Sequence, residues 1–387
     1  MRIINVKDMG LEAVEKLLKK PAFDQVELNP RIREANKKLF GADLTAAEIV
    51  DKIVGDVRRD GDEAVIKYTK LIDRTEFTPE EFVVTEAEYE AAYQEADPAV
   101  VESLRKAAEN VRRYHQEQKP NSWMTYRDKG SILGQSVIPL DRVGIYVPGG
   151  TAAYPSSVIM NAMPAVVAGV KEIIMMVPPK NGKINPYVLV AAKEAGVSKI
   201  FKIGGAQAIA AMAFGTETIP RVDKITGPGN IFVTLAKKAV YGHCDIDMLA
   251  GPSEILIVAD KTADPAYTAA DMLSQAEHDM LASSIVITDS PELAEKVAAE
   301  AEKQLKVLPR EEITRASLDR NGMIIITEDI MQAVELANVS APEHMEVLTE
   351  QPFQLLPYIR HAGAVFLGAY SPEPLGDYFA GPNHVLP

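Results

Sequence analysis

The chain has 387 residues, which at roughly 150 residues per domain corresponds to two or three domains. Its 41 basic and 55 acidic side chains give a formal net charge of −14, and this negative balance excludes electrostatic binding to nucleic acid. The hydrophobic fraction of 47% and the charged fraction of 25% are ordinary for a folded globular protein and exclude general disorder.

The single cysteine, Cys244, cannot form a disulfide within the chain, which fits a reducing compartment and excludes a zinc finger built on cysteines. The N-terminal residues lack the apolar stretch of a signal peptide. The longest apolar stretch, Val158–Val170, is too short to cross a bilayer. We therefore expect a cytoplasmic protein without a membrane span.

The first 30 residues end in Leu28–Pro30 and show no clear period, so we interpret them as an N-terminal arm. Signals for helix starts follow the arm. Thr45–Glu48 and Thr85–Glu88 have the capping-box pattern, and Asp97 precedes Pro98 as an N-cap precedes a first helical turn. The chain up to about residue 120 is therefore expected to be mostly helical.

Short apolar strands alternate with helices in the rest of the chain, and this alternation indicates βαβ units with parallel sheets buried on both faces. The predicted strands are Ile132–Leu140, Val143–Val147, Ile173–Val177, Lys199–Ile203, Lys224–Thr226, Glu254–Ala259, Ser284–Thr288, Met323–Thr327 and Ala364–Leu367. The pattern begins again at Glu254. We therefore predict an α/β fold with two consecutive incomplete Rossmann-like parallel-sheet domains and an N-terminal helical arm.

The early helices need a sheet to pack against, and we expect them on the second sheet. The predicted division is an arm at residues 1–30, a domain made of 31–141 with 250–387, and an inserted domain at 142–249. Ligands are expected beyond the carboxyl ends of the strands, where helix N-termini are exposed.

Three glycine loops end strands of the first sheet: Tyr146–Thr151, Gly204–Gln207 and Gly227–Asn230. Glycine permits close backbone approach, and each loop leads into a predicted helix whose N-terminus favours anions. None has the complete G-x-G-x-x-G pattern, and a tight turn explains any one of them alone. Three such loops on one edge favour a nucleotide-sized ligand. Ser253, at the start of the second sheet, is a candidate substrate contact or a turn serine.

Gln275 and His278 lie three residues apart near the end of a predicted helix, and therefore on one helical face. An amide oxygen and an imidazole nitrogen can both ligate zinc. Pairs with this spacing are also common on helix surfaces that bind no metal.

Glu343 and His344 follow Ala341 and Pro342 in a loop, where both side chains can point into one cleft. A histidine that titrates near neutrality and a glutamate that activates water suit general acid–base catalysis. Two solvated loop side chains are the alternative reading. Nearer the C-terminus, Asp377 and His384 lie among glycines and aromatic residues, where a metal ligand and a substrate contact are plausible.

Taken together, these motifs resemble histidinol dehydrogenase from about residue 30 to the last residue. The resemblance rests on seven blocks in the same order: Val143–Gly150, Gly204–Ala210, Gly227–Asn230, Leu249–Glu254, Gln275–His278, Ala341–His344, and Gly376–Asp377 with Asn383–Pro387. It implies the oxidation of L-histidinol to L-histidine with two NAD⁺, as the last steps of histidine biosynthesis, in a zinc-dependent homodimer.

The resemblance also implies roles for individual residues. It implies that NAD is contacted by Tyr146, Gln207 and Asn230, in the inserted domain. Zinc would be bound by Gln275, His278 and Asp377. The substrate would be contacted by Ser253, Gln275, His278, His344, Asp377 and His384. The catalytic pair would be Glu343 and His344, with His344 as the base and Glu343 activating water for the second oxidation.

Members of this family carry a further C-terminal tail that supplies a histidine ligand to zinc and a glutamate for the substrate, both across the dimer. The present chain stops at Pro387, so we expect it to bind zinc weakly or not at all. Alternatives from the residues alone are a related zinc-dependent dehydrogenase of another small polar alcohol, a zinc hydrolase that uses Glu343, and a binding module without catalysis. The glycine loops argue against the hydrolase, and the Glu343–His344 pair argues against the binding module.

Overall fold

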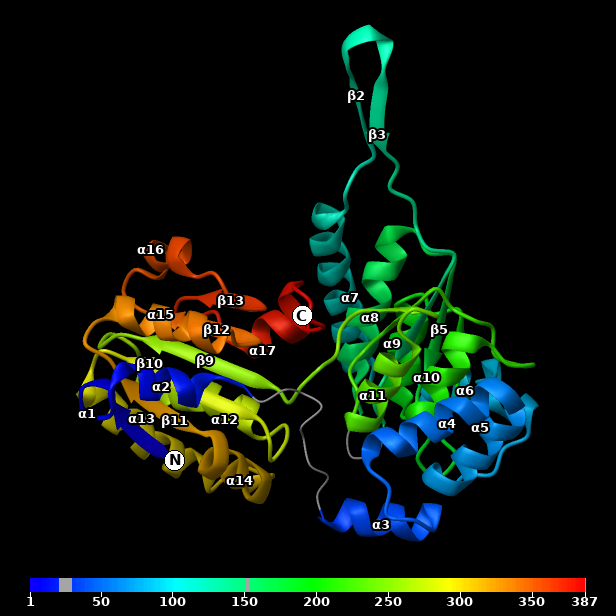
Figure 1. Ribbon diagram of the computed structural model, residues 1–387, viewed down its shortest axis with the longest axis horizontal. Coiled ribbons are helices and arrows are strands. Elements are labelled where there is room, and N and C mark those ends of the chain that lie inside the picture. Colours follow the sequence, from blue (N-terminus) through cyan, green and yellow to red (C-terminus); the bar gives the residue numbers. More distant parts are fainter. Residues whose placement is uncertain (21–29, 150–152, 387) are drawn as a thin grey trace. The chain divides into compact units, whose positions relative to one another are not determined.

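The computed structural model describes residues 1–20, 30–149 and 153–386 (Figure 1). The predicted end of the arm at Leu28 and Asn29, the end of the first glycine loop at Gly150 and Thr151, and Pro387 lie outside the described residues. The chain forms two compact units. The six-stranded unit contains residues 1–20, 251–377 and 386, and the five-stranded unit contains 30–149, 153–250 and 378–385.

The five-stranded unit is built on a parallel sheet with the strand order β6-β5-β4-β7-β8. Its strands are β4 (Arg142–Tyr146), β5 (Glu172–Met176), β6 (Lys199–Phe201), β7 (Lys224–Thr226) and β8 (Asp245–Ile246). Its helices are α3 (Pro30–Phe40), α4 (Ala46–Asp60), α5 (Asp62–Tyr68), α6 (Glu86–Glu95), α7 (Pro98–Gln118), α8 (Pro155–Ala168), α9 (Pro186–Glu194), α10 (Gly205–Phe214) and α11 (Ile231–Val240).

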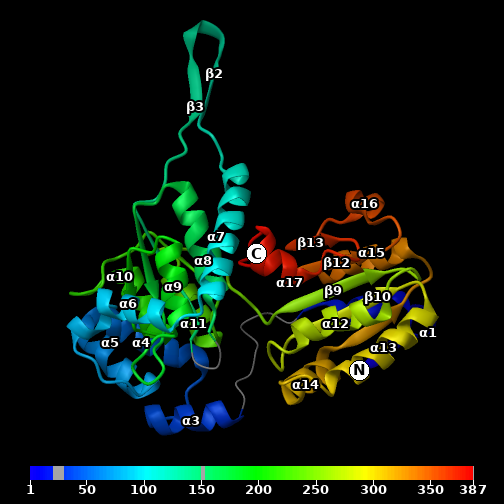
Figure 2. The same cartoon turned by 180° about the vertical axis from the view of Figure 1, so that it is seen from behind.

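Helices cover both faces of this sheet (Figure 1 and Figure 2). Ile173 and Met175 of β5 pack with α6 to α9, whereas Ile174 and Met176 pack with α4, α5, α10 and α11. Successive side chains of a strand point to opposite faces, so the continuous apolar run of β5 fills two cores.

The predicted starts of three early helices are confirmed. Thr45 and Thr85 form reciprocal capping boxes with Glu48 and Glu88, at the beginnings of α4 and α6. Asp97 caps α7, whose first residue is a proline. Side-chain oxygens that accept hydrogen bonds from the first free amides fix these helix starts locally.

The strand predicted at Ile132–Leu140 is shorter in the structure and does not belong to the five-stranded sheet. It is β3 (Ile132–Gln135), which pairs antiparallel with β2 (Trp123–Tyr126) in a separate hairpin. Figure 1 shows this hairpin following α7 and projecting from the helices of its unit. Its large apolar side chains are exposed, including Met124 at 77% and Tyr126 at 78%.

The six-stranded unit is also built on a parallel sheet, with the order β1-β11-β10-β9-β12-β13. Its strands are β1 (Arg2–Asn5), β9 (Glu254–Ala259), β10 (Ser283–Thr288), β11 (Met323–Ile326), β12 (His344–Leu348) and β13 (Ala364–Leu367). Its helices are α1 (Val6–Met9), α2 (Leu11–Leu18), α12 (Pro265–Ala276), α13 (Pro291–Leu305), α14 (Glu311–Asn321), α15 (Ile330–Ser340), α16 (Pro352–Leu355) and α17 (Glu373–Leu375).

The two sheets share one topology. Numbered within its own unit, each has the order 3-2-1-4-5, and the N-terminal strand β1 is added at one edge of the larger sheet. This is the strand order of a Rossmann half-fold with one strand missing. The prediction of two consecutive incomplete Rossmann-like sheets is therefore confirmed.

The early helices pack on the five-stranded sheet and not, as we expected, on the six-stranded one. α4 contacts α10 and α11, while α7 contacts α8. The described residues of 31–141 thus belong with those of 142–249, and the predicted boundary at 142 was wrong for the structure. The apolar faces of these helices contain no information about which of two similar sheets they cover.

The N-terminal arm is part of a sheet instead of a free appendage. β1 pairs with β11, and α2 packs beside α15 with Val14 and Leu18 buried. Among the residues that the structure describes, no helix combines the length and the apolar character that a membrane span needs.

A buried ion pair fixes the third glycine loop. Lys237 of α11 is 2% exposed, and its Nζ donates to the carboxylate of Asp247 and to the carbonyl of Gly227 at 2.9 Å. Asp247 in turn accepts a hydrogen bond of 2.7 Å from the amide of Gly227.

We expect Lys237→Met to lower the free energy of unfolding by about 3–5 kcal/mol, because it leaves the Asp247 carboxylate buried without its cation. Urea denaturation of the full chain measures this change. The double variant Lys237→Met/Asp247→Asn keeps an acceptor for Gly227 and removes the orphaned charge, so it should recover part of the loss. A double variant less stable than Lys237→Met would contradict this account.

Candidate active site

The candidate site lies at the amino-terminal ends of neighbouring strands in the six-stranded unit. His344 is the first residue of β12, Glu254 is the first residue of β9, and these strands pair in parallel. Gln275 reaches the same edge from the end of α12. These residues therefore lie at the amino-terminal edge of this sheet, and not beyond the carboxyl ends of its strands, where we expected ligands.

The imidazole of His344 is buried between hydrogen-bond acceptors on both ring nitrogens. Its Nδ1 lies 2.9 Å from the carbonyl oxygen of Glu254, and its Nε2 lies 3.1 Å from Oδ2 of Asp377. The carboxylate of Asp377 at Nε2 favours the protonated ring, while Nδ1 meets both the carbonyl of Glu254 and, at 3.1 Å, the side-chain amide nitrogen of Gln275. Burial alone lowers the pKa of His344, but the hydrogen bond and negative charge of Asp377 outweigh burial and raise it to about 9.

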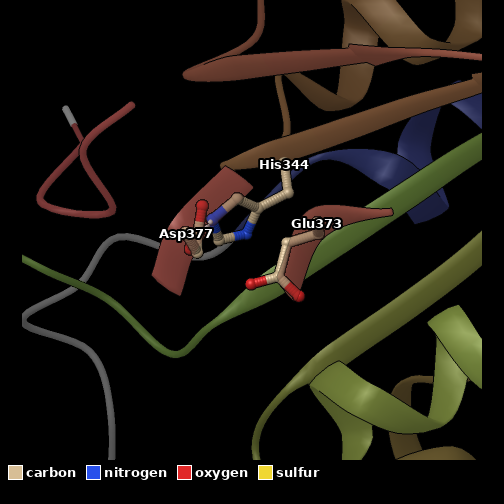
Figure 3. Close-up of side chains that lie close together, drawn as sticks. All are labelled: His344, Glu373 and Asp377. Carbon is tan, nitrogen blue, oxygen red and sulfur yellow. Dashed lines mark hydrogen bonds and ion pairs between the residues drawn. The ribbon is translucent and has the colours of Figure 1, made fainter. Parts of the chain in front are cut away.

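A cluster of ligand-type side chains surrounds this imidazole. Ligand atoms of His344, Glu373 and Asp377 all lie within 4.8 Å of one another, and all three residues are buried (Figure 3). Burial and the neighbouring charge of Asp377 raise the pKa of Glu373 to about 8. Buried carboxylates that crowd together in this way are stabilised by a cation, and oxygen with imidazole nitrogen is a donor set that suits zinc.

The segment that follows β13 holds both carboxylates in place. Glu373 begins α17, and its backbone amide donates to Oε1 of Glu346 in β12 at 2.7 Å. Asp377 follows four residues later in a π-helical turn, Gly376–Ala380. A side chain at Gly376 would place its Cβ 2.4 Å from the ring of Phe366, so close packing requires glycine there.

Gln275 and His278 occupy different environments. Gln275 is 1% exposed, and its Nε2 lies 3.1 Å from Nδ1 of His344. His278 is exposed just beyond α12, and its Nδ1 donates to the carbonyl of Ser274 at 2.8 Å. A histidine held through Nδ1 presents Nε2 as the free ligand nitrogen, which is the arrangement that metal-binding histidines use.

Glu343 lies next to this cluster. Its Oε2 is 3.8 Å from Nδ1 of His344 and accepts a hydrogen bond of 3.1 Å from the amide of Glu254. Burial raises the pKa of Glu343. Ser253 precedes β9, is half-buried, and accepts a hydrogen bond through its carbonyl from Ser283 at 3.0 Å.

The residues predicted to contact NAD lie in the five-stranded unit, at the carboxyl ends of its strands. Tyr146 ends β4, and its hydroxyl accepts a hydrogen bond of 3.1 Å from the amide of Gly205. Gln207, in the first turn of α10, is completely buried and donates to Asp73 at 3.2 Å. Burial raises the pKa of Asp73 to about 6.

The third residue of this group, Asn230, caps α11 and accepts hydrogen bonds from Phe232 and Val233 at 3.0 and 3.3 Å. A Cβ on Gly227 would lie 2.1 Å from the carbonyl oxygen of Tyr146, so the ends of β4 and β7 approach each other closely. The strand order reverses between β4 and β7, which is where Rossmann-like sheets bind ligands.

His384 belongs to the five-stranded unit, unlike the other predicted substrate contacts. Its Nε2 lies 3.4 Å from the hydroxyl of Ser157 in α8, and its ring packs edge-on against Tyr378. The predicted role of His384 therefore stays a prediction.

Sequence reasoning missed three acidic residues: Glu373, Glu254 and Asp73. Glu373 had a detectable signal, because it precedes Asp377 by four residues, the spacing of one helical face. Glu254 was named only as the first residue of a predicted strand and as the end of the Leu249–Glu254 block. Asp73 had no local signal, since its partner Gln207 is 134 residues away.

In metal-free protein we expect His344 to titrate near pH 9, because Asp377 stabilises its protonated form. Asp377→Asn should lower this pKa toward or below its ordinary value of 6.5, and added Zn²⁺ should lower it as well. Imidazole signals followed by NMR during a pH titration provide the measurement. His361, which contacts the carbonyl of Asn338 at 3.1 Å, serves as the internal control. A His344 signal that titrates at or below pH 6.5 before substitution would contradict the assignment.

Comparison with known proteins agrees with this architecture. A sequence model described as histidinol dehydrogenase matches residues 36–387. The histidinol dehydrogenase of Carboxydothermus hydrogenoformans is 57% identical over 338 residues, covering 87% of this chain and 80% of that protein. That of Bacillus subtilis is 56% identical over 339 residues, covering 87% and 79%.

A crystal structure of histidinol dehydrogenase from Elizabethkingia anophelis has a TM-score of 0.90 at 35% identity, and covers 100% of this chain and 84% of that chain. The matched residues include the cluster around His344 and the three glycine loops. The chain therefore belongs to the histidinol dehydrogenase family, whose members are oxidoreductases that convert histidinol to histidine in histidine biosynthesis.

Proposed function

We propose that this protein oxidises L-histidinol to L-histidine in two NAD⁺-dependent steps through bound histidinal, with Glu343 and His344 as its catalytic residues. One observation carries the proposal: a buried histidine lies between Glu343 and a carboxylate cluster that suits a metal ion. Glu343 and His344 can both transfer protons, and they lie beside carboxylates that can hold a metal ion or a polar substrate.

His344 acts as the base in the first step. It takes the proton from the hydroxyl of histidinol as hydride leaves the same carbon for NAD⁺, which yields histidinal. Asp377 and the Glu254 carbonyl fix the orientation of the His344 ring. Their hydrogen bonds also stabilise the protonated ring, and this sets the pH at which the neutral base becomes available.

Glu343 acts in the second step. Its carboxylate takes a proton from water as the water oxygen adds to the aldehyde carbon of histidinal. The resulting gem-diol then loses a proton and a hydride, the latter to a second NAD⁺. The raised pKa of buried Glu343 makes it a stronger base than an exposed glutamate. Retaining the aldehyde between steps limits its side reactions.

We infer that zinc is held by Gln275, His278 and Asp377. Gln275 and Asp377 lie on either side of the His344 imidazole, and His278 keeps Nε2 available. Glu373 is a further carboxylate of the same cluster. A bound zinc ion would offset the buried negative charge and hold the nitrogen atoms of the substrate as a template. Ser253 and His384 complete the proposed substrate contacts.

We infer that NAD binds on the five-stranded unit through Tyr146, Gln207 and Asn230. Support comes from their places at the carboxyl ends of the strands and from the reversal of strand order beside Tyr146. The helix α10 starts without a side-chain cap of its own at Gly204, which leaves backbone amides at this edge.

A homodimer is proposed as the assembled form. The β2–β3 hairpin supports it, because an isolated two-stranded hairpin with exposed apolar side chains is marginal in water and gains stability from a partner surface. A cytoplasmic location is proposed from Cys244, which is a free buried thiol.

The two catalytic residues should carry separable steps. Glu343→Gln should lower the oxidation of added histidinal about 100- to 10,000-fold, because it removes the carboxylate that takes the proton from water. The reverse of the first step, reduction of histidinal by NADH, needs no water and should stay near the parental rate. His344→Asn should impair both reactions. Oxidation of histidinal by Glu343→Gln at the parental rate would show the proposed role to be wrong.

NAD binding should depend on Gln207. Gln207→Met keeps the volume and removes the amide, so we expect the dissociation constant for NAD⁺ to rise about tenfold. Isothermal titration calorimetry measures it, with histidinol as the control ligand whose affinity should not change. Unchanged NAD⁺ affinity in a folded variant would count against the assignment of this site.

A further inference from the structure

The N-terminal segment reaches the candidate active site, although it lies before the residues that match the family. β1 forms an edge strand of the six-stranded sheet, α2 packs beside α15, and the described part of the segment ends at Lys20. The strand β1 and the helix α2 that runs back from it thus place Lys20 at the amino-terminal edge of this sheet.

Lys20 joins two parts of that edge. Its Nζ donates to the carboxylate of Glu254, the first residue of β9, and to the carbonyl of Ala341 at 2.7 Å. Ala341 caps the C-terminus of α15 in the left-handed region at φ 47° and begins the connection that carries Glu343 and enters β12 at His344. Left-handed backbone is costly for alanine, so contacts such as that from Lys20 help to hold it.

Glu254 contacts both catalytic residues. Its carboxylate accepts a hydrogen bond of 3.3 Å from the amide of Glu343, and its own amide donates to the carboxylate of Glu343 at 3.1 Å. Its carbonyl oxygen lies 2.9 Å from Nδ1 of His344. Three polar groups of one residue therefore orient the pair.

The two glutamates carry like charges that neighbouring groups offset. Burial has the largest effect on the pKa of Glu343 and raises it; the charge of His344 and the hydrogen bond from the Glu254 amide lower it, and the negative charge of Glu254 raises it by a smaller amount. Like charges in partly buried surroundings repel, and the repulsion would push the side chains apart. Lys20 supplies the opposite charge directly on Glu254.

We propose that Lys20 and Glu254 are positioning residues that hold the carboxylate of Glu343 in place for water activation. The proposal rests on the proposed role of Glu343. It assigns to the N-terminal segment a part in the second oxidation, and none in the first.

The test compares two reactions of the full chain: oxidation of histidinal by NAD⁺, which needs Glu343, and reduction of histidinal by NADH, which does not. Lys20→Met should lower kcat for the oxidation about 10- to 100-fold, the scale of a misplaced catalytic group, and leave its KM and the rate of the reduction near parental. Lys20→Arg should keep most of the oxidation. Lys16→Met, which removes an exposed lysine of α2, is the matched control.

A second variant, Glu254→Gln, removes the charge bound by Lys20. Like Lys20→Met, it should lower the ratio of the rate of histidinal oxidation to the rate of histidinal reduction. An equal fall of both reactions in Lys20→Met and Glu254→Gln would show a structural tie only and overturn the proposal. So would parental ratios in both variants, provided that Glu343→Gln lowers the ratio. If Glu343→Gln itself leaves the ratio unchanged, the proposed function of Glu343 fails, and the positioning proposal falls with it.

Discussion

The structure of the site depends on one buried imidazole that meets a hydrogen-bond acceptor at each nitrogen. A charged histidine with almost no solvent contact is unfavourable unless its protons are accepted and its charge is paired. Asp377 meets both needs at Nε2, and the Glu254 carbonyl orients the ring at Nδ1. The carboxylates near His344 also lie close to one another, and the pKa of Glu373 is raised first by burial and then by the charge of Asp377, so the groups of this cluster titrate together.

The two sheets have the same strand order, yet their candidate sites lie at opposite edges. In the five-stranded unit the glycine loops stand at the carboxyl ends; α8 and α10 begin without side-chain caps of their own, whereas Asn230 caps α11. In the six-stranded unit, Asp264, Ser290 and Asp329 cap α12, α13 and α15. Since these side chains already bind the first helical amides, the carboxyl-end edge offers fewer free donors to a ligand.

Local rules predicted a large part of the fold. Thr45, Thr85 and Asp97 marked helix starts because capping depends on groups only two or three residues apart. Adjacent or helically spaced pairs such as Gln275 with His278 and Glu343 with His344 were found for the same reason. The choice of sheet for α4 and α7 was wrong, because it depends on packing against α8, α10 and α11, which follow much later in the chain.

The sequence by itself determined the α/β class, the two parallel sheets, the capped starts of α4, α6 and α7 and the family, since these depend on periodicity and on short motifs. Only the tertiary structure decided that the N-terminal segment brings Lys20 to Glu254 and that Glu373 joins His344 and Asp377. Lys20 and Glu254 are 234 residues apart, and Glu373 is 27 residues from Glu346, the residue of β12 that accepts a hydrogen bond from its backbone amide. Local motifs do not reveal these two long-range contacts, because they form only when whole helices and strands reverse the chain direction.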